Sequence, residues 1–390
     1  MTGAPEGVGA RRTALEVLSR VIDQGAYANI ALPAVLARSE LDERDRALVT
    51  DLVYGTVRMR RACEFLVDRF PARRPPPAGR AALLLGAYQV AYRNDIPAYA
   101  AVSSTVGATP KRFRSLVNAV LRKVAGAPLE FPDAATELSY PDWLVELMVA
   151  DHGKEAALAA LAAMNEPAAT HVRADGYVQD LASQWVAEHF ASALDPTVGS
   201  RVVELCAAPG GKATAIASKG SWVAALDLRD SRVELLRSNI AALGTSEVAA
   251  VRGDALRAPF AAGSVDGVLL DAPCSGLGVL RRRPDARWRL EEAAPGRLAA
   301  LQRSMVDAAV GLVRDGGVLT YSVCTLSAVE TLGIDEHLAT THPHMQPLEP
   351  PGAPWIPWGR GALLMPDARG SDGMALFSYR AGGGAGGPVG

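Results

Sequence analysis

The chain has 390 residues, of which 49% are hydrophobic and 21% charged, the composition of a globular protein long enough for two or three domains. Its net charge is −2 and its pI about 6.3, so any basic surface for a nucleic acid must be local. None of the four cysteines forms a CxxC pair, which argues against a zinc site or a disulfide framework and fits a cytoplasmic protein. No apolar run has the length of a membrane span and the N-terminus lacks the apolar segment of a signal peptide, so we expect neither a metal nor a membrane partner.

Residues 11–126 have the pattern of a domain built of helices alone. In "RRTALEVLSRVIDQ" the apolar residues lie on one face at helical spacing: Ala14, Leu15, Leu18, Val21 and Ile22. The runs "RALVTDLVYGTVRMRRACEFLVD" and "RAALLLGAYQVAYR" continue the pattern without strand-like alternation. We therefore predict a helical domain at 11–126, preceded by a disordered N-terminus at 1–10 and followed by a helical connector at 127–200.

From Arg201 onward, short β-rich runs alternate with helical segments. The runs "RVVEL", "WVAALDL", "EVAAVRGD", "VDGVLLDAP" and "GGVLTYSVC" are the expected strands. This alternation predicts a parallel, doubly wound sheet in a Rossmann-like α/β domain at 201–381. The late runs "GALLM" and "MALFSYR" are predicted to form an edge hairpin, and the glycine-rich residues 382–390 a disordered tail.

A glycine-rich turn, "CAAPGGK", follows the first expected strand and opens a helix. Gly210 and Gly211 allow a ligand to approach the backbone closely. Asp227 ends the next strand, about 20 residues further on, where an acid accepts hydrogen bonds from ribose hydroxyls. The turn has neither GxGxxG nor GK[ST], so a nucleoside without a pyrophosphate, such as S-adenosylmethionine (SAM), suits it better than a dinucleotide. An ordinary strand–helix turn with a surface aspartate stays open as the alternative.

Two further acids end expected strands: Asp254 the third strand and Asp271 the fourth. Ligands of doubly wound sheets bind outside the carboxyl ends of the strands, so these acids favour a binding site there. Cys274 lies just past the fourth strand and Cys324 ends the fifth. Sequential parallel strands often lie side by side, about 4.8 Å apart, so both thiols could open on one crevice.

A cysteine is more often a small buried hydrophobe than a reactive group. We keep that interpretation for Cys63, on a helix, and for the thiol of Cys206, within the glycine-rich turn. A thiol pair beside a SAM site suits methylation of cytosine C5. A thiolate that adds to C6 makes C5 nucleophilic, and a carboxyl group near N3 stabilises the charge that develops on the ring.

The run "VLRRRPDARWR" follows Cys274 directly, and we expect it to bind RNA. Its arginines would grip phosphates and Trp288 would stack on a base; the arginines are Arg281, Arg282, Arg283, Arg287 and Arg289. Two clusters in the helical domain are predicted to be solvated faces instead: Arg58, Arg60 and Arg61, and Lys111, Arg112 and Arg114.

Together, "LCAAPGGK", "DAPCSGLGVLRRRPD" and "YSVCTL" resemble the Sun/Fmu/RsmB branch of the NOL1/NOP2/Sun family of RNA cytosine-C5 methyltransferases. The N-terminal runs "GTVRMRRACEFLVD" and "RSLVNAVLRKVA" resemble the NusB-like RNA-binding domain of that branch. The resemblance extends from about Arg11 to Arg380 and implies 16S rRNA as the substrate.

The resemblance also implies a role for each matching position. Cys324 would be the nucleophile that attacks C6, Cys274 would assist release of the product, and Asp271 would face the target base. The SAM-binding residues would be Cys206, Ala207, Ala208, Pro209, Gly210, Gly211, Lys212, Asp227, Asp254 and Asp271. Cys206 would take part through its backbone position.

Three features depart from the family pattern. Val323 precedes the nucleophile where threonine is usual, and Thr331 follows Glu330 where asparagine is common. A small mixed subdomain that helps to hold RNA is reduced, near residues 165–180, to "NEPAATHVRADGYVQDLASQ". This reduction keeps two alternatives open: the same chemistry on tRNA or another RNA, and a non-catalytic RNA-binding protein. A DNA methyltransferase is a weaker alternative, in which Cys274 and not Cys324 would be the nucleophile.

Overall fold

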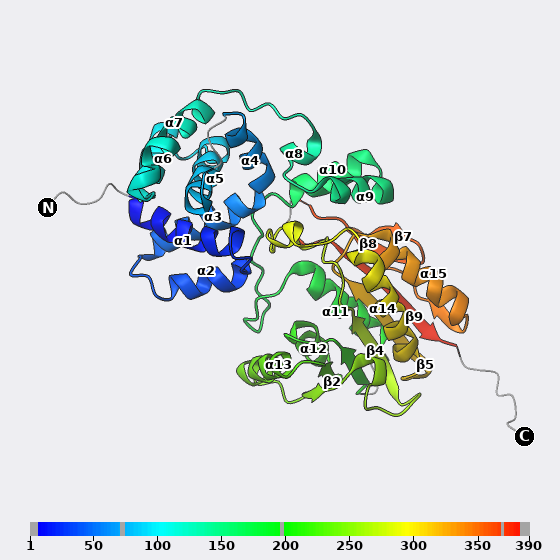
Figure 1. Ribbon diagram of the computed structural model, residues 1–390. Coiled ribbons are helices and arrows are strands. Elements are labelled where there is room, and N and C mark those ends of the chain that lie inside the picture. The colour runs from blue at the N-terminus through cyan, green and yellow to red at the C-terminus, as the bar shows by residue number, and fades with distance from the viewer. Residues whose placement is uncertain (1–6, 71–74, 196–198, 368–369, 383–390) are drawn as a thin grey trace, which may run out of the picture. The chain divides into compact units, whose positions relative to one another are not determined.

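The computed structural model describes residues 7–70, 75–195, 199–367 and 370–382 (Figure 1). The chain forms two compact units. The first contains 1–146, 157–165 and 282–289, and the second contains 147–156, 166–281 and 290–390. The short segment 282–289 thus belongs to the first unit, although the sequence places it inside the predicted α/β domain.

The first unit is helical, as predicted. Its helices in chain order are α1 (Val8–Ile22), α2 (Ala28–Leu36), α3 (Glu43–Arg58), α4 (Arg60–Asp68), α5 (Pro77–Tyr92), α6 (Ala98–Ala108), η1 (Lys111–Phe113), α7 (Arg114–Ala125) and α8 (Ala134–Glu137). Helix α5 packs against α3 and α7 with almost no space between them. A Cβ on Gly55 would lie 2.0 Å from the Tyr88 ring, and one on Gly86 would lie 2.2 Å from Leu121. Glycine at these two positions therefore permits the close helix packing.

The predicted disorder at 1–10 is wrong for residues 8–10. Val8 and Ala10 are buried in the first turn of α1, because their apolar side chains belong to its core-facing side. Residues 1–6 and 383–390 of the predicted disordered ends lie outside the described residues. After the first unit, α9 (Asp142–His152) and α10 (Lys154–Ala163) contribute residues to both units.

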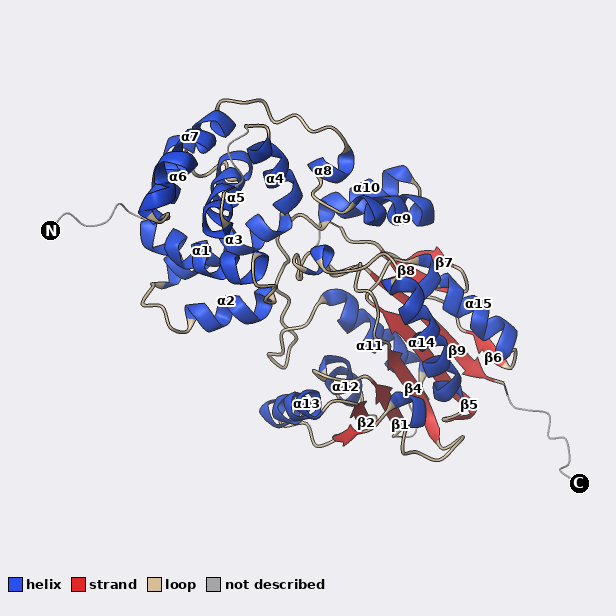
Figure 2. Ribbon diagram, in the orientation of Figure 1, coloured by secondary structure: helices blue, strands red, loops and turns tan. Residues whose placement is uncertain are grey.

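The described residues of the second unit contain one sheet of nine strands, which is drawn in red in Figure 2. Its strands are β1 (Arg201–Leu205), β2 (Trp222–Asp227), β3 (Val248–Arg252), β4 (Val265–Asp271), β5 (Val313–Val323), β6 (Met345–Pro347), β7 (Ile356–Trp358), β8 (Gly361–Leu364) and β9 (Met374–Ala381). The order is β3-β2-β1-β4-β5-β9-β8-β7, and β6 pairs with β9. Strands β1 to β5 are parallel, which confirms the predicted doubly wound sheet.

The predicted hairpin of the two late strands forms, since β8 and β9 pair antiparallel. It is not an edge hairpin, however, because β9 also pairs antiparallel with β5 and so lies inside the sheet. All but one residue of β9 is buried, as its continuous apolar character allows.

Helices cover the sheet and connect its parallel strands. They are α11 (Leu181–Ala193), α12 (Gly211–Ala217), α13 (Asp230–Leu243), η2 (Ala255–Arg257), α14 (Ala294–Val310), η4 (Ala328–Glu330) and α15 (Leu332–Thr341); η3 (Ala286–Trp288) belongs to the first unit. In Figure 2, α14 and α15 lie together in front of the sheet. The crossovers bring the carboxyl ends of β1, β2, β4 and β5 to one edge of the sheet.

Candidate active site

Five of the residues singled out in the sequence lie along this edge. Cys206 directly follows β1, Asp227 ends β2, Asp271 ends β4, Cys274 lies three residues beyond, and Cys324 directly follows β5. Leu205 at the end of β1 lies opposite Leu270 on β4, and Asp271 at the end of β4 lies opposite Ser322 on β5. The expected convergence at neighbouring strand ends is thus present in the structure.

The two thiols of this edge are in contact. The Sγ atoms of Cys274 and Cys324 are 3.4 Å apart, a hydrogen-bonding distance for sulfur. The pKa of Cys274 is raised well above its ordinary value, first by this hydrogen bond to Cys324 and then by burial. Either thiol can donate in this contact, and the raised pKa of Cys274 favours its protonated form. The backbone N–H of Gly278 donates to the Cys324 carbonyl at 3.0 Å, which ties the two cysteine loops together.

A buried carboxylate, that of Glu330 in η4, joins the residues that follow the two cysteines. Its Oε1 accepts from the backbone N–H of Ser275 at 2.9 Å and from Nε2 of Gln302 at 3.0 Å. Its Oε2 accepts from the hydroxyls of Ser275 and Thr325, the latter at 3.1 Å. The two hydroxyls are themselves 2.8 Å apart. Burial raises the pKa of Glu330, although these hydrogen bonds oppose the shift. The network fixes one loop against the other.

The carboxylate of Asp271 is held by two partners. Its Oδ2 lies 2.6 Å from Nζ of Lys212, and its Oδ1 accepts from the Ser322 hydroxyl at 3.0 Å. Burial would lower the pKa of Lys212, but the nearby Asp271 carboxylate raises it, so the ammonium stays charged. The sequence prediction placed both residues in the site, and the structure pairs them.

Glu204 on β1 is a site residue that the sequence analysis missed. It is 2% exposed, and burial raises its pKa to about 8. Its Oε2 atom has no hydrogen-bond partner among the described residues. A buried polar atom without a partner is costly, which makes this carboxyl group a candidate for a hydrogen bond to a ligand. The signal was available, because Glu204 is a charged residue in an otherwise apolar run of a buried strand.

The glycine-rich turn has the backbone that a tight ligand loop requires. Gly210 has a φ of +102°, and a Cβ there would lie 2.5 Å from Leu236. Burial raises the pKa of the Cys206 thiol to about 12, which disfavours its thiolate form. Ala207, the residue after Cys206, donates its N–H to Leu226 of β2 at 2.9 Å, and Gly210 donates to Ala207 at 2.7 Å.

The two remaining predicted acids differ in their surroundings. Asp227 is nearly buried and accepts from the Ala208 N–H at 3.2 Å and from Nε of Arg232 at 3.1 Å. It therefore connects the glycine-rich turn to the end of β2. Asp254 is partly exposed and caps η2 by accepting from the Leu256 N–H at 3.0 Å.

The prediction that the arginine run after Cys274 binds RNA is wrong for most of its residues. Arg287 is completely buried and donates to the carbonyls of Arg58 and Ser139 and to the Tyr140 hydroxyl, at 3.0–3.2 Å. Trp288 donates its indole N–H to the carbonyl of Val57 at 2.7 Å and packs against the helical core.

The other residues of the run differ in exposure. Arg281 is 2% exposed and bonds to the Asp367 carbonyl, and Arg289 donates to the carbonyls of Gly25 and Ala26. Arg283 is exposed, and Arg282 is partly buried. Most of this run therefore takes part in folding, because its guanidinium groups satisfy backbone carbonyls that would otherwise be unpaired.

The N-terminal basic clusters also differ from the prediction in part. Lys111 and Arg112 are exposed, as expected for a solvated face. Arg58, however, is 7% exposed. Arg61 donates to the Thr136 hydroxyl at 3.2 Å and to the Tyr140 carbonyl. Among the described residues, no group of three or more His, Cys, Asp or Glu could hold a metal ion, and no helix is long and apolar enough to cross a membrane.

A tight loop lies after β1, and beside it is a buried carboxyl group whose Oε2 has no hydrogen-bond partner among the described residues. This arrangement suits SAM, a nucleoside that carries an ammonium group. The fold and this site together define the class of SAM-dependent methyltransferases. Residues 191–376 match the family of 16S rRNA methyltransferases RsmB/F, and residues 9–126 match the NusB family.

Curated relatives match the chain over nearly its whole length. One is the ribosomal RNA small subunit methyltransferase B of Thermus thermophilus, 35% identical over 95% of this chain and 96% of the relative. Another, from Mycobacterium tuberculosis and described only as a methyltransferase, is 33% identical over 95% of this chain and 96% of the relative. The solved structure of PH0851 shares the fold, with a TM-score of 0.76, 20% identity and coverage of 97% and 99%. The chain belongs to the RsmB/F family of SAM-dependent RNA cytosine-C5 methyltransferases, with a NusB-type N-terminal domain.

Proposed function

We propose that this protein methylates C5 of a cytosine in 16S rRNA through a covalent bond between Cys324 and C6 of the base. The observation that carries the proposal is the contact of two thiols, 3.4 Å apart, at neighbouring strand ends beside the Lys212–Asp271 pair. The Thermus thermophilus relative, whose name gives the small-subunit RNA as its substrate, supports the choice of RNA. Such a substrate implies a cytoplasmic location, where ribosomes are made.

The cofactor would lie along the carboxyl edge of β1 and β2. Its contacts would be the loop from Cys206 to Lys212 and the side chains of Asp227, Asp254 and Asp271. The unpartnered Oε2 of Glu204 would accept from the cofactor's ammonium group. Bound SAM would supply an electrophilic methyl group.

Two exposed apolar side chains close in sequence to the acids Asp227 and Asp254 are proposed to contact the adenine ring. Leu228 follows Asp227 and is 58% exposed, and Leu256 follows Asp254 by two residues and is 38% exposed. A flat adenine ring would cover both and remove apolar surface from water.

In the proposed reaction, the Cys324 thiolate forms a bond to C6 of the cytosine. The two sulfur atoms are in hydrogen-bonding contact. The S–H of Cys274 would donate to the Cys324 sulfur and stabilise the negative charge on it, both before attack and when the bond breaks. Asp271 would face the ring near N3, where charge develops. After methylation of C5, a base removes the C5 proton, the C6–S bond breaks, and Cys324 is returned as a thiolate.

The same chemistry on tRNA or another RNA is the second candidate. The observation that favours it is the short segment between α10 and α11, which contains a two-residue β-bridge, Val172 with Val178, in place of a subdomain. A smaller RNA-holding element fits a different or smaller RNA.

The test is transfer of labelled methyl groups from SAM to unmodified 16S rRNA, 23S rRNA and tRNA, with bisulfite sequencing of each labelled RNA. Label at one cytosine of 16S rRNA supports the proposal. Label confined to tRNA moves the substrate to the second candidate. Label at a base other than cytosine contradicts the proposed reaction.

A further inference from the structure

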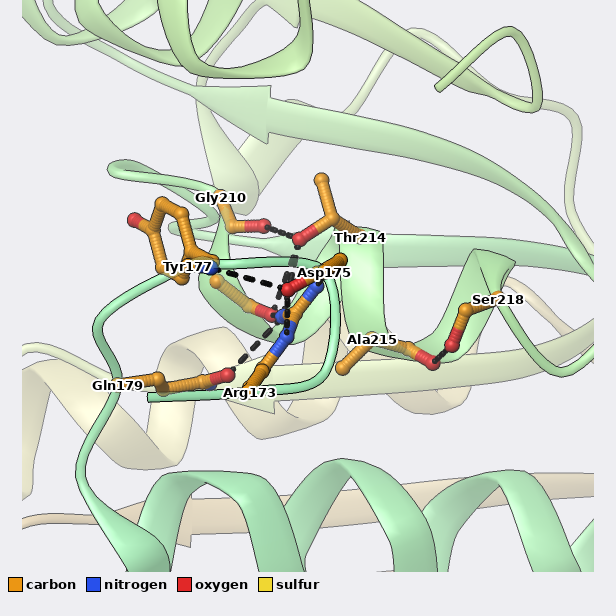
Figure 3. Close-up of polar contacts among 9 residues, drawn as sticks. Arg173, Asp175, Tyr177, Gln179, Gly210, Thr214, Ala215 and Ser218 are labelled. Carbon is orange, nitrogen blue, oxygen red and sulfur yellow. Dashed lines mark hydrogen bonds and ion pairs between the residues drawn. The ribbon is translucent and has the colours of Figure 1, made fainter. Parts of the chain in front are cut away.

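The reduced segment before α11 folds as a short hairpin. Arg173 and Tyr177 pair through a 2.9 Å backbone hydrogen bond, and the N–H of Gly176 donates to the Arg173 carbonyl at 2.9 Å. Gly176 has a φ of +86°, a conformation that glycine adopts without strain. The hairpin thus places the Arg173 side chain on the first turn of α12, next to the glycine-rich turn (Figure 3).

The Arg173 guanidinium bonds directly to that turn. Its Nη1 donates to the Gly211 carbonyl at 2.6 Å and lies 3.1 Å from the Thr214 hydroxyl and 3.0 Å from Oε1 of Gln179 (Figure 3). The Arg173 side chain is only 9% exposed. Thr214 in turn donates its hydroxyl to the Gly210 carbonyl at 2.9 Å. Hydrogen bonds therefore connect the hairpin through Thr214 to Gly210.

A carboxylate within the hairpin orients the guanidinium. Asp175 accepts from Nε and Nη2 of Arg173, and from the backbone N–H of Tyr177 at 3.1 Å. The hydrogen bond to Arg173 lowers the pKa of Asp175, which keeps the carboxylate charged. The guanidinium carbon also lies 5.2 Å from the centre of the Tyr177 ring. Asp175 thus holds Nε and Nη2 of the guanidinium group, and Nη1 points at α12.

The hairpin packs against the loop without a gap. A Cβ on Gly211 would lie 3.0 Å from both the Tyr177 ring and Nε2 of Gln179. The hairpin and the first turn of α12 are therefore in direct contact at Gly211.

We propose that Arg173 is a positioning residue for cofactor binding, which holds the Gly210–Thr214 segment in the conformation that receives SAM. The inference rests on the proposed cofactor role of that loop. Without the guanidinium, the Gly211 carbonyl and the Thr214 hydroxyl lose a charged donor, and the loop must be ordered by the cofactor itself. Ordering a loop on binding weakens affinity and leaves the chemical step unchanged.

The experiment measures SAM binding to the full chain by calorimetry without RNA, and kcat and KM for SAM with saturating RNA. Arg173→Ala is expected to raise the dissociation constant and KM for SAM by about tenfold or more, with kcat changed less than about twofold. Arg173→Lys, which keeps one charged donor but not the fork, is expected to recover part of the affinity. Thr214→Val removes the hydroxyl that accepts from Arg173 and donates to the Gly210 carbonyl, at nearly constant volume. It is expected to weaken binding less than Arg173→Ala, which loses every contact of the guanidinium group.

Arg93→Ala is the matched control, because Arg93 also forms a forked pair with an aspartate two residues on, Asp95, but in the helical unit. It is expected to leave SAM affinity unchanged. The proposal is overturned if Arg173→Ala binds SAM as tightly as the wild type. It is also overturned if kcat falls while KM is unchanged, or if both alanine variants lose affinity equally. The binding measurement needs no RNA, so a wild type that binds SAM but methylates no rRNA contradicts the proposed substrate and leaves this inference to be judged on binding alone.

Discussion

Cys274 and Cys324 lie 50 positions apart in the sequence, yet their sulfur atoms are 3.4 Å apart. The pairing of β4 with β5 brings their loops together, and Glu330 bonds to the residue after each cysteine. The contact with Cys324 and burial raise the pKa of Cys274, which favours its protonated form. The proposed function gives the two thiols different tasks, with Cys324 as the nucleophile and Cys274 as the hydrogen-bond donor.

The two cysteines should therefore differ when each is replaced. Cys324→Ala is expected to abolish methyl transfer, because no nucleophile remains to activate C5. Cys274→Ala is expected to form the covalent RNA–protein bond but release it slowly, because the departing sulfur loses its hydrogen-bond donor. Denaturing gels of each variant with RNA and SAM would measure this. A covalent complex with Cys324→Ala, and none with Cys274→Ala, would reverse the assignment and favour the mechanism of DNA enzymes.

Glu330 should matter for turnover although it is completely buried. A glutamine in its place offers one acceptor oxygen where the carboxylate offers two, so the Ser275 and Thr325 loops lose part of their connection. Glu330→Gln is expected to lower kcat by about 10- to 100-fold, since small displacements of reacting groups have effects of this size. KM for SAM should be nearly unchanged.

Asp335→Asn is a suitable control for that variant. Asp335 is another buried carboxylate of the second unit, bonded to Arg360 and Tyr379. Asp335→Asn should lower the unfolding temperature but should not change kcat at a temperature where the protein is folded. Equal losses of kcat in both variants would show that Glu330 acts only through stability.

Glu204 should make stability depend on pH. Its pKa is about 8 in the folded protein and about 4.3 when unfolded, so between these values the folded state holds a proton that the unfolded state has released. The free energy of unfolding therefore falls as pH rises from about 4.3 to 8. Glu204→Gln lacks this contribution and is expected to gain stability relative to the wild type between pH 5 and pH 8, as measured by urea unfolding without SAM. A free energy of unfolding that changes with pH in the same way in both proteins would contradict this prediction.

Arg287 should stabilise the helical unit. Its guanidinium is fully buried, and burial lowers its pKa to about 10. Arg287→Ala leaves several buried acceptors unpaired and is expected to lower the free energy of unfolding by about 3 kcal/mol or more. Arg283→Ala, an exposed arginine of the same run, should change it by less than about 0.5 kcal/mol. Similar unfolding curves for both variants would exclude the structural role.

Much of the site could be predicted from sequence because it follows from sheet topology. Parallel strands in sequential order place their carboxyl ends together, so Asp271 and Cys324 could be assigned to one edge from the positions of two β-rich runs. The glycine-rich turn could be identified for a different reason, because its residue types suit a tight loop.

Other features depend on contacts that no local pattern contains. The partners of Arg287 lie between 122 and 229 positions earlier in the chain, so its run could not be distinguished from an exposed basic patch. The insertion of β9 beside β5 likewise depends on long-range pairing. Arg173 lies in a short segment without a recognisable motif, so its contacts with α12 could not be predicted from the sequence.

The most direct test of the mechanism uses RNA that contains 5-fluorocytidine at the target site. Fluorine replaces the C5 proton and cannot be removed by a base, so the bond between the enzyme and C6 cannot be released once the methyl group has been transferred. Protease digestion and mass spectrometry would then identify the modified residue. The account predicts that the nucleotide is attached to Cys324. Attachment to Cys274, or release of the RNA without any covalent bond, would contradict it.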